Sequence, residues 1–279
     1  MNSRPGLIDL IGPDFDRENS APADRTLLIC AAPRSGSYEL CRLLIAAGVS
    51  VPHEYFNPNY ANRIALRFKL AGDPLSDDRL GDYIDLLRRH RSANNIFAAK
   101  FNYRQFEKHL RNRHGAALFD GAAVIHLFRP DAAAQYESLR TALASGRWDF
   151  TDRQTTPPIP LNADTRPTQI LREAEIMAAE DSCFRVLFIA LGIRPIFVTS
   201  DTLFANPSAV VREIADRFGV TVDDAGLQRM IAFGKRYGDA GSKGMLLDDP
   251  PLRAALRRHV FGETNLQPAA DSGKYLSLD

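Results

Sequence analysis

The sequence predicts an α/β protein with a P-loop-like central parallel sheet and helices on both faces. Short apolar runs of strand length alternate with longer helical patterns along the 279 residues, and a tight loop joins the first run to the first helix. Hydrophobic residues make up 45% of the chain, which is enough to bury a sizeable core. Alternating strands and helices favour a mostly parallel sheet, because the helical connections cover both of its faces.

Four apolar runs flanked by polar residues or turn formers are the predicted strands. They are Thr26–Ala32, Ile96–Phe101, Ala122–Phe128 and Pro195–Thr199. Helical periodicity lies between and after them. The predicted helices are Tyr38–Ala47, Leu80–Arg91, Ala132–Ala144, Pro167–Leu191 and Ser208–Phe218.

No change in composition divides the chain, so we expect a single domain over residues 1–279. The termini, residues 1–24 and 262–279, are expected to be irregular. The segment Thr151–Arg166 is rich in Pro, Thr and Asp and is predicted to be a long loop. The basic, Gly-rich stretch Gly234–Lys243 is predicted to be a loop, which either closes over a ligand or is simply a solvated surface loop.

Composition excludes several classes of protein. A net charge of +1, from 35 basic and 34 acidic side chains, argues against a general nucleic-acid-binding protein. Three cysteines without metal-ligand spacing form neither a disulfide framework nor a metal site. The N-terminus has no apolar leader, and the most apolar later stretch, 184–193, is too short to span a bilayer. We therefore expect a cytoplasmic protein with no integral membrane segment.

The loop after the first predicted strand, Pro33–Tyr38, is the most informative stretch. Backbone N–H groups at such a helix start are unpaired and bind phosphate. Gly36 lets the backbone approach an anion, Ser35 and Ser37 add hydroxyl donors, and Arg34 adds a charged planar fork. A kinase P-loop needs Gly-x-x-x-x-Gly-Lys-Ser/Thr, and this loop lacks the first Gly and the Lys. An ordinary strand–turn–helix with a serine N-cap is the alternative interpretation.

A second anion segment follows the third predicted strand. Arg129 stands at the carboxyl end of that strand, where ligands of open α/β sheets bind. Ser138 lies nine residues further on, two turns into the next predicted helix. Taken alone, Ser138 is equally well explained as a solvent-facing or back-bonded helix serine.

With these two segments the sequence resembles the sulfotransferases that use 3′-phosphoadenosine-5′-phosphosulfate (PAPS), over roughly Leu27 to Phe218. It is most similar to the bacterial branch that includes the trehalose 2-sulfotransferase. The resemblance implies a sulfotransferase-type fold. It assigns the loop at Arg34 to the 5′-phosphosulfate and assigns Arg129 and Ser138 to the 3′-phosphate, with Gln135 and Trp148 at the family's spacing. Where the family usually has Thr, this chain has Tyr38, which leaves the last hydroxyl contact of the loop open.

Two further matches concern catalysis. Glu54, within Gly48–Phe56, occupies the family position of the proposed general base, and Lys100 occupies a position near the leaving phosphate. Asn102 stands where the animal cytosolic branch has a catalytic His, which agrees with a base at Glu54. Partial desolvation beside aromatic residues is expected to raise the pKa of Glu54. His53 remains a competing candidate for the base.

The resemblance thus implies transfer of a sulfuryl group from PAPS to a hydroxyl of a carbohydrate or glycolipid acceptor, without a metal. The predicted catalytic residues are Glu54, Lys100 and Arg34, and the predicted PAPS-binding residues are Arg34, Ser35, Gly36, Ser37, Tyr38, Arg129 and Ser138. Acceptor contacts are expected from 57–75, 151–166 and the C-terminal tail. Homodimers occur in the branch, so a homodimer is compatible with the resemblance. The alternatives are a metal-dependent P-loop kinase of a small molecule and a non-catalytic nucleotide- or glycan-binding module.

Overall fold

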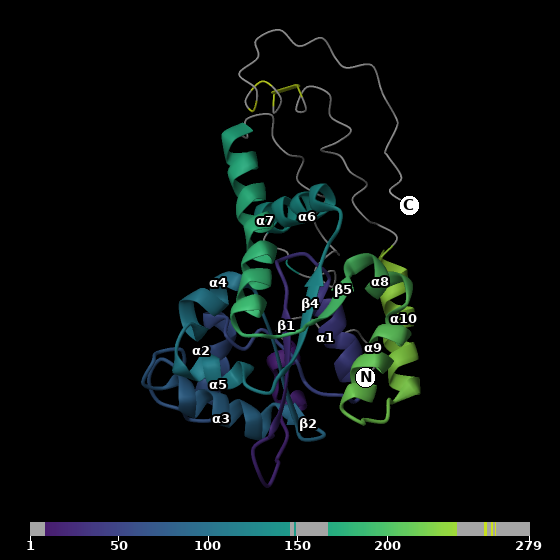
Figure 1. The fold of residues 1–279 in the computed structure, drawn as a ribbon. Helices are drawn as coiled ribbons and strands as arrows, with labels where there is room; N and C mark the ends of the chain where they lie inside the picture. Colours follow the sequence, from purple (N-terminus) through teal and green to yellow (C-terminus); the bar gives the residue numbers. More distant parts are fainter. Residues whose placement is uncertain are drawn as a thin grey trace.

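The computed structural model describes residues 9–145, 148 and 167–238, together with residues 254, 255, 258 and 260. These residues contain a five-stranded sheet in the order β2-β3-β1-β4-β5 (Figure 1). The strands are β1 (Arg25–Cys30), β2 (Ser92–Ala93), β3 (Ile96–Phe101), β4 (Ala123–Phe128) and β5 (Ile196–Thr199). Only β2, at one edge, runs antiparallel. All four predicted strands are confirmed to within two residues at either end.

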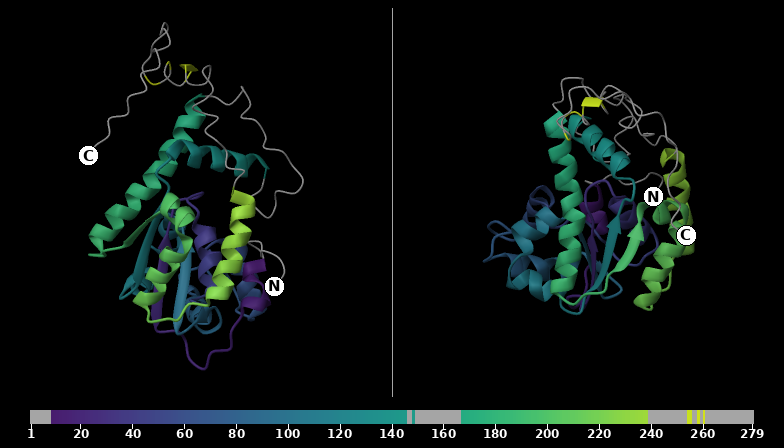
Figure 2. Two further views of the ribbon diagram at one scale, coloured as in Figure 1. Left: turned by 90° about the vertical axis from the view of Figure 1, so that its right-hand side faces the viewer. Right: turned by 45° about the horizontal axis from the view of Figure 1, so that its top comes forward.

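Helices cover both faces of the sheet, as predicted (Figures 1 and 2). One face packs against α2 (Pro58–Arg67), α3 (Leu80–His90), α5 (Arg113–Phe119) and α7 (Pro167–Ala190). The other packs against α1 (Ser37–Ala46), α8 (Ser200–Ala205), α9 (Pro207–Arg217) and α10 (Asp224–Gly238). Alternate residues of β1 therefore enter different cores: Leu28 joins the first and Leu27 the second.

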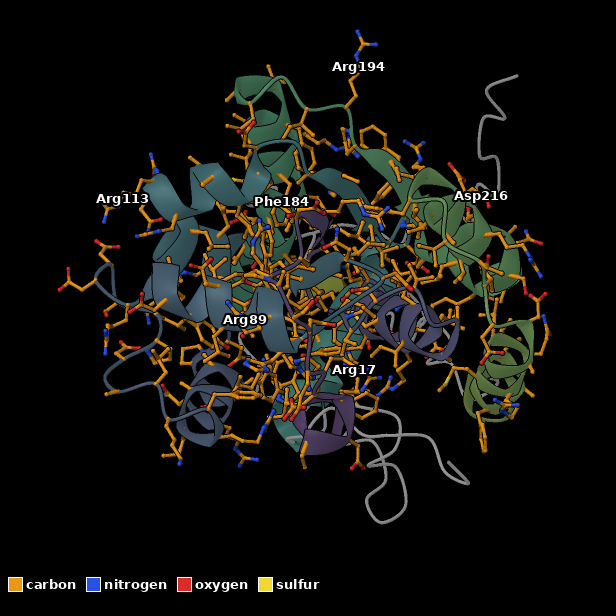
Figure 3. All side chains as sticks on the ribbon, turned by 90° about the horizontal axis from the view of Figure 1, so that it is seen from below. Arg17, Arg89, Arg113, Phe184, Arg194 and Asp216 are labelled. Carbon is orange, nitrogen blue, oxygen red and sulfur yellow. The ribbon has the colours of Figure 1, made fainter. Side chains whose placement is uncertain are left out.

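Seen from below, the labelled side chains of Arg113, Arg194 and Asp216 lie at the periphery of the molecule, and Phe184 lies nearer its middle (Figure 3). Phe184 of α7 is fully buried and stacks on Phe188 at 6.0 Å between ring centroids. Arg113, Arg194 and Asp216 are exposed. Among the described helices, none is both long and apolar enough to cross a membrane.

The predicted helices are confirmed as α1, α3, α6 (Ala132–Ser145), α7 and α9. The described part of the stretch predicted as the loop Gly234–Lys243 belongs to α10, so that prediction is wrong there. The region 57–75, expected to be an acceptor loop, contains α2, which begins with Pro58 at its first position. The predicted loop 151–166 and the C-terminal tail from 262 lie outside the described residues. Elements that the sequence patterns did not predict are β2, α2, α4 (Tyr103–Gln105), the π-helical turn η3 (Phe106–Leu110), α5, α8 and α10.

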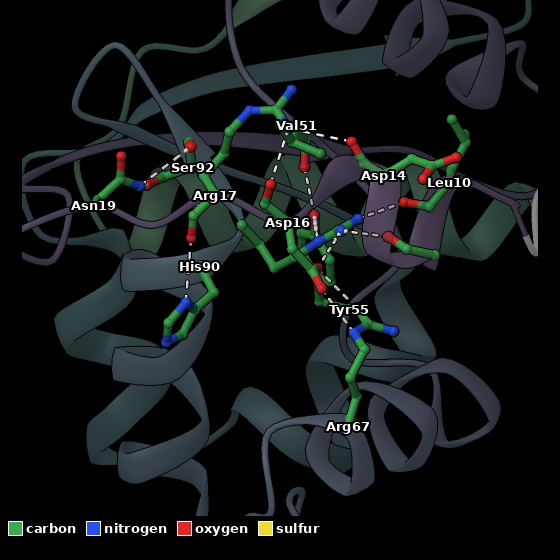
Figure 4. A network of polar contacts seen from close by, with 12 residues as sticks. Leu10, Asp14, Asp16, Arg17, Asn19, Val51, Tyr55, Arg67, His90 and Ser92 are labelled. Atoms are coloured by element: carbon green, nitrogen blue, oxygen red, sulfur yellow. Dashed lines mark hydrogen bonds and ion pairs between the residues drawn. The ribbon is translucent and has the colours of Figure 1, made fainter.

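The N-terminal segment, expected to be irregular, forms two 3₁₀ turns, η1 (Asp9–Ile11) and η2 (Pro13–Phe15), that are anchored to the core (Figure 4). The fully buried guanidinium of Arg91 donates to the carboxylate of Asp16 at 2.9 Å and to the hydroxyl of Tyr55 at 3.1 Å. Arg67 of α2 grips the same carboxylate with two hydrogen bonds, of 2.7 and 2.8 Å. This network ties the N-terminal segment to the chain that carries Tyr55.

Candidate functional site

The loop between β1 and α1 has the backbone of an anion-binding turn. Arg34 and Gly36 have left-handed conformations, with φ of 67° and 92°. The φ of Gly36 favours glycine, and a Cβ there would also make a tight contact, 3.2 Å from the ring of Phe204. Gly36 is the N-cap of α1 and supplies no side-chain cap. The alternative of a serine-capped turn is therefore wrong, and no N-cap side chain satisfies the N–H groups of the first turn of α1.

The structure brings the two predicted nucleotide segments together. The Arg34 Nε donates to the hydroxyl of Ser138 on α6 at 2.9 Å, and its Nη1 donates to the carbonyl of Trp148 at 2.7 Å. The side-chain amide of Gln135 donates to the carbonyl of Pro33 at 2.8 Å. Residues about a hundred positions apart thus meet at the carboxyl edge of the sheet, where ligands of such sheets bind.

Three further residues predicted to bind the donor differ in their surroundings. Ser35 is fully buried, and its hydroxyl makes no hydrogen bond within the described part of the chain. Ser37 is the first residue of α1 and is buried as well. Arg129 follows β4 directly and is half-buried.

Sheet register places Glu54 beside Lys100. The chain at His53 adds to the free edge of β3 beyond β2: His53 bridges to Ala99 in the parallel sense, and the Lys100 N–H donates to the His53 carbonyl at 2.9 Å. The next residue along each chain is then a neighbour of the other. The Lys100 Nζ lies 2.5 Å from Glu54 Oε1, and both side chains are buried.

The other carboxylate oxygen of Glu54 is occupied too. Its Oε2 accepts hydrogen bonds from the Tyr38 hydroxyl at 2.8 Å and from the Asn57 amide at 3.2 Å. Burial alone would raise the pKa of Glu54, but the Lys100 ammonium and the hydrogen bonds from Lys100, Tyr38 and Asn57 outweigh it, and the pKa is lowered. The expected rise in pKa is therefore wrong for this state, in which the carboxylate is ionised at neutral pH.

Two contacts of Glu54 were not predicted from the sequence. Tyr38 turns its hydroxyl to Glu54, although its position in the sequence belongs to the phosphate loop. Asn57 caps α2 by accepting from the Asn59 N–H, and its amide reaches Glu54. The Asn57-Pro58 pair is a helix-start signal that could have revealed the cap, though not the contact.

The structure also gives Asn102 and His53 other surroundings. Asn102 is the N-cap of α4, in a capping box with Gln105, which accounts for its presence at the end of β3. The ring of His53 is fully buried and lies 5.5 Å from the Tyr38 ring and 4.8 Å from the Tyr60 ring, between centroids. Within the residues described, no group of His, Cys, Asp or Glu side chains has the arrangement of a metal site.

A comparison with protein families now identifies the class. The model of the Stf0 sulphotransferase family matches residues 26–240, a range that includes every predicted site residue. The chain belongs to this family, and is a PAPS-dependent sulfotransferase. The roles of the individual site residues remain predictions.

Two solved structures are similar over most of the chain. The sulfotransferase domain from the Synechococcus PCC 7002 olefin synthase is 19% identical, with 96% of this chain and 94% of that chain covered and a TM-score of 0.42. The sulfotransferase domain from the curacin biosynthetic pathway is 16% identical, with 76% and 77% covered and a TM-score of 0.41. Curated proteins gave no significant match. The family assignment rests on the family match.

Proposed function

We propose that this sulfotransferase transfers the sulfuryl group of PAPS to a hydroxyl of a carbohydrate or glycolipid acceptor, with Glu54 as the general base. The observation that carries the base assignment is the buried, ionised Glu54 beside Lys100, next to the donor loop. The carbohydrate acceptor is supported by the resemblance to the trehalose 2-sulfotransferase branch. We also expect the protein to be cytoplasmic.

The donor is held at both of its ends in this proposal. The N–H groups at the start of α1 and the hydroxyls of Ser35 and Ser37 bind the 5′-phosphosulfate. Arg129 and Ser138 bind the 3′-phosphate, and Arg34, already hydrogen-bonded to Ser138, connects the two ends. Buried Ser35, without a partner in the described chain, has a donor hydroxyl to offer.

The transfer itself is an in-line displacement at sulfur. The acceptor oxygen forms a bond to sulfur while the bond from sulfur to the bridging phosphate oxygen breaks, and the electron pair stays on the phosphate of adenosine 3′,5′-bisphosphate. Lys100 and Arg34 stabilise that developing charge, and Glu54 takes the proton of the acceptor hydroxyl. When Lys100 turns from Glu54 to the donor, the pKa of Glu54 rises, so the base strengthens as the donor binds.

A binding experiment tests this function against the alternatives. Adenosine 3′,5′-bisphosphate should bind without metal and should raise the melting temperature, whereas ATP with Mg²⁺ should not. The opposite result would favour a metal-dependent kinase. Binding of the bisphosphate without turnover, in a screen of sugar and glycolipid acceptors with labelled PAPS, would favour the non-catalytic module.

Glu54→Gln tests the base. The amide keeps the size of the side chain but takes up no proton at neutral pH, so kcat should fall by about 10²–10⁴ while PAPS binding is kept. The matched control is Glu173→Gln, because Glu173 likewise accepts from a tyrosine hydroxyl, that of Tyr136, and pairs with a cation, Arg140. Its kcat should stay normal. Normal turnover in Glu54→Gln together with collapse in His53→Gln would transfer the base to His53.

A further inference from the structure

Tyr38 contacts both members of the buried pair formed by Glu54 and Lys100. Its backbone belongs to the first turn of α1, directly after the donor loop. Its hydroxyl donates to Glu54 Oε2 at 2.8 Å, and its ring centroid lies 4.7 Å from the Lys100 Nζ, within the range of a cation–π contact. One side chain thus contacts the carboxylate of the pair and its ammonium.

The contacts of the two carboxylate oxygens are unequal. Oε2 accepts from two neutral groups that are fixed in helices, the Tyr38 hydroxyl on α1 and the Asn57 amide at the start of α2. Oε1 pairs with the Lys100 ammonium, which sits at the end of a long and rotatable side chain. Oε2 is therefore held by two fixed donors, whereas Oε1 becomes accessible to the acceptor hydroxyl when Lys100 moves.

We propose that Tyr38 is a positioning residue of the transfer reaction, which clamps Glu54 Oε2 so that Oε1 is the oxygen that receives the acceptor proton. This inference rests on the proposed role of Glu54 as the base. The acceptor O–H proton passes to Oε1 as the new O–S bond forms, and the electron pair of the broken S–O bond leaves on the phosphate. The hydrogen bond from Tyr38 is kept throughout, so the hydroxyl orients the base without itself exchanging a proton with the acceptor.

The inference explains the tyrosine in a loop where the resemblance leads one to expect threonine. A threonine side chain is too short to reach from α1 across to the chain at Glu54. With tyrosine in place of threonine, the donor loop has one hydroxyl fewer, and Glu54 gains a hydrogen-bond donor. Tyr38 then contributes to donor binding through its backbone N–H alone.

Tyr38→Phe isolates the hydroxyl, since the ring and its contact with Lys100 stay. We expect kcat at saturating PAPS to fall roughly tenfold or more, the fold-change of a lost hydrogen bond to a charged group, while the affinity for adenosine 3′,5′-bisphosphate is retained. The Tyr38 hydrogen bond lowers the pKa of Glu54, so its loss raises that pKa. The acidic limb of the kcat profile should therefore move to higher pH.

The matched control is Tyr136→Phe, which removes another tyrosine–carboxylate hydrogen bond, the 3.0 Å bond to Glu173, and should alter neither kcat nor the pH profile. The inference is overturned if Tyr38→Phe does not shift the acidic limb of the kcat–pH profile. It is also overturned if the substitution weakens binding of the bisphosphate without changing kcat. Failure of the base itself is recognised separately, because Glu54→Gln would then turn over normally.

Discussion

At the scale of single residues, a substitution of Arg129 tests the proposal that this residue binds the 3′-phosphate. It follows β4 directly and is half-buried, at the carboxyl end of a parallel strand, where ligands of such sheets bind. We expect Arg129→Ala to weaken the binding of adenosine 3′,5′-bisphosphate by roughly 1.5–3 kcal/mol, the contribution of a charge-assisted hydrogen bond. The binding of adenosine 5′-phosphate should be almost unchanged. Calorimetry with both nucleotides measures the difference. Equal losses would show that Arg129 does not read the 3′-phosphate.

Glu180 on α7 makes the stability of the fold depend on pH. The carboxylate is buried, and burial raises its pKa to about 7, although Arg104 lies 3.2 Å away. The folded state therefore keeps a proton that the unfolded chain has already released. The contribution of Glu180 to the free energy of unfolding is complete below the pKa of the unfolded chain. It is lost as pH rises from about 4.5, the unfolded pKa, to about 7, the folded pKa.

The measurement compares the wild type with Glu180→Gln, which does not titrate. Across that window the free energy of unfolding of the wild type should fall, relative to the variant, by up to about 3 kcal/mol. Denaturant titrations at several pH values give the difference directly. A difference that stays constant with pH would mean that Glu180 titrates alike in both states.

At the scale of elements, the turns η1 and η2 are expected to depend on the ion pair of Asp16 with Arg91. Removing the carboxylate in Asp16→Ala leaves a fully buried guanidinium without its counter-charge, which should cost about 3 kcal/mol of unfolding free energy. The matched control is Asp82→Ala, which breaks the exposed pair with Arg79 and should cost less than about 1 kcal/mol. Equal effects of the two substitutions in urea denaturation would contradict the anchoring role.

Elements differ in how far the sequence predicts them. Strands such as β3 are short apolar runs buried on both faces, so their type and bounds follow from local composition. The short helices α4, α5 and α8 span at most seven residues, which is too little chain for a period of 3.6 to be recognised. These helices are stabilised by caps and by packing against their neighbours rather than by their own periodicity.

At the scale of the whole molecule, one sheet shared by two cores should unfold as a unit. We expect a single calorimetric transition with matching calorimetric and van't Hoff enthalpies, as for one cooperative domain. Adenosine 3′,5′-bisphosphate at a hundredfold excess over Kd should stabilise that transition by about 2.7 kcal/mol. Two separate transitions, of which the nucleotide shifts only one, would contradict the single-domain prediction.

The sequence by itself determined the fold class and predicted the two nucleotide segments, because both predictions depend on local features. Apolar runs, a glycine in the loop before a helix and an arginine at a strand end are recognised along the chain, and the edge rule for parallel sheets then predicts that Arg34 and Arg129 lie on one side. Only the tertiary structure decided which groups contact Glu54. Its pairing with Lys100 depends on the register between the chain at His53 and β3, and the direction of Tyr38 depends on how α1 packs. Those are contacts between segments far apart in sequence, so their effect on the pKa of Glu54 could not be derived from composition.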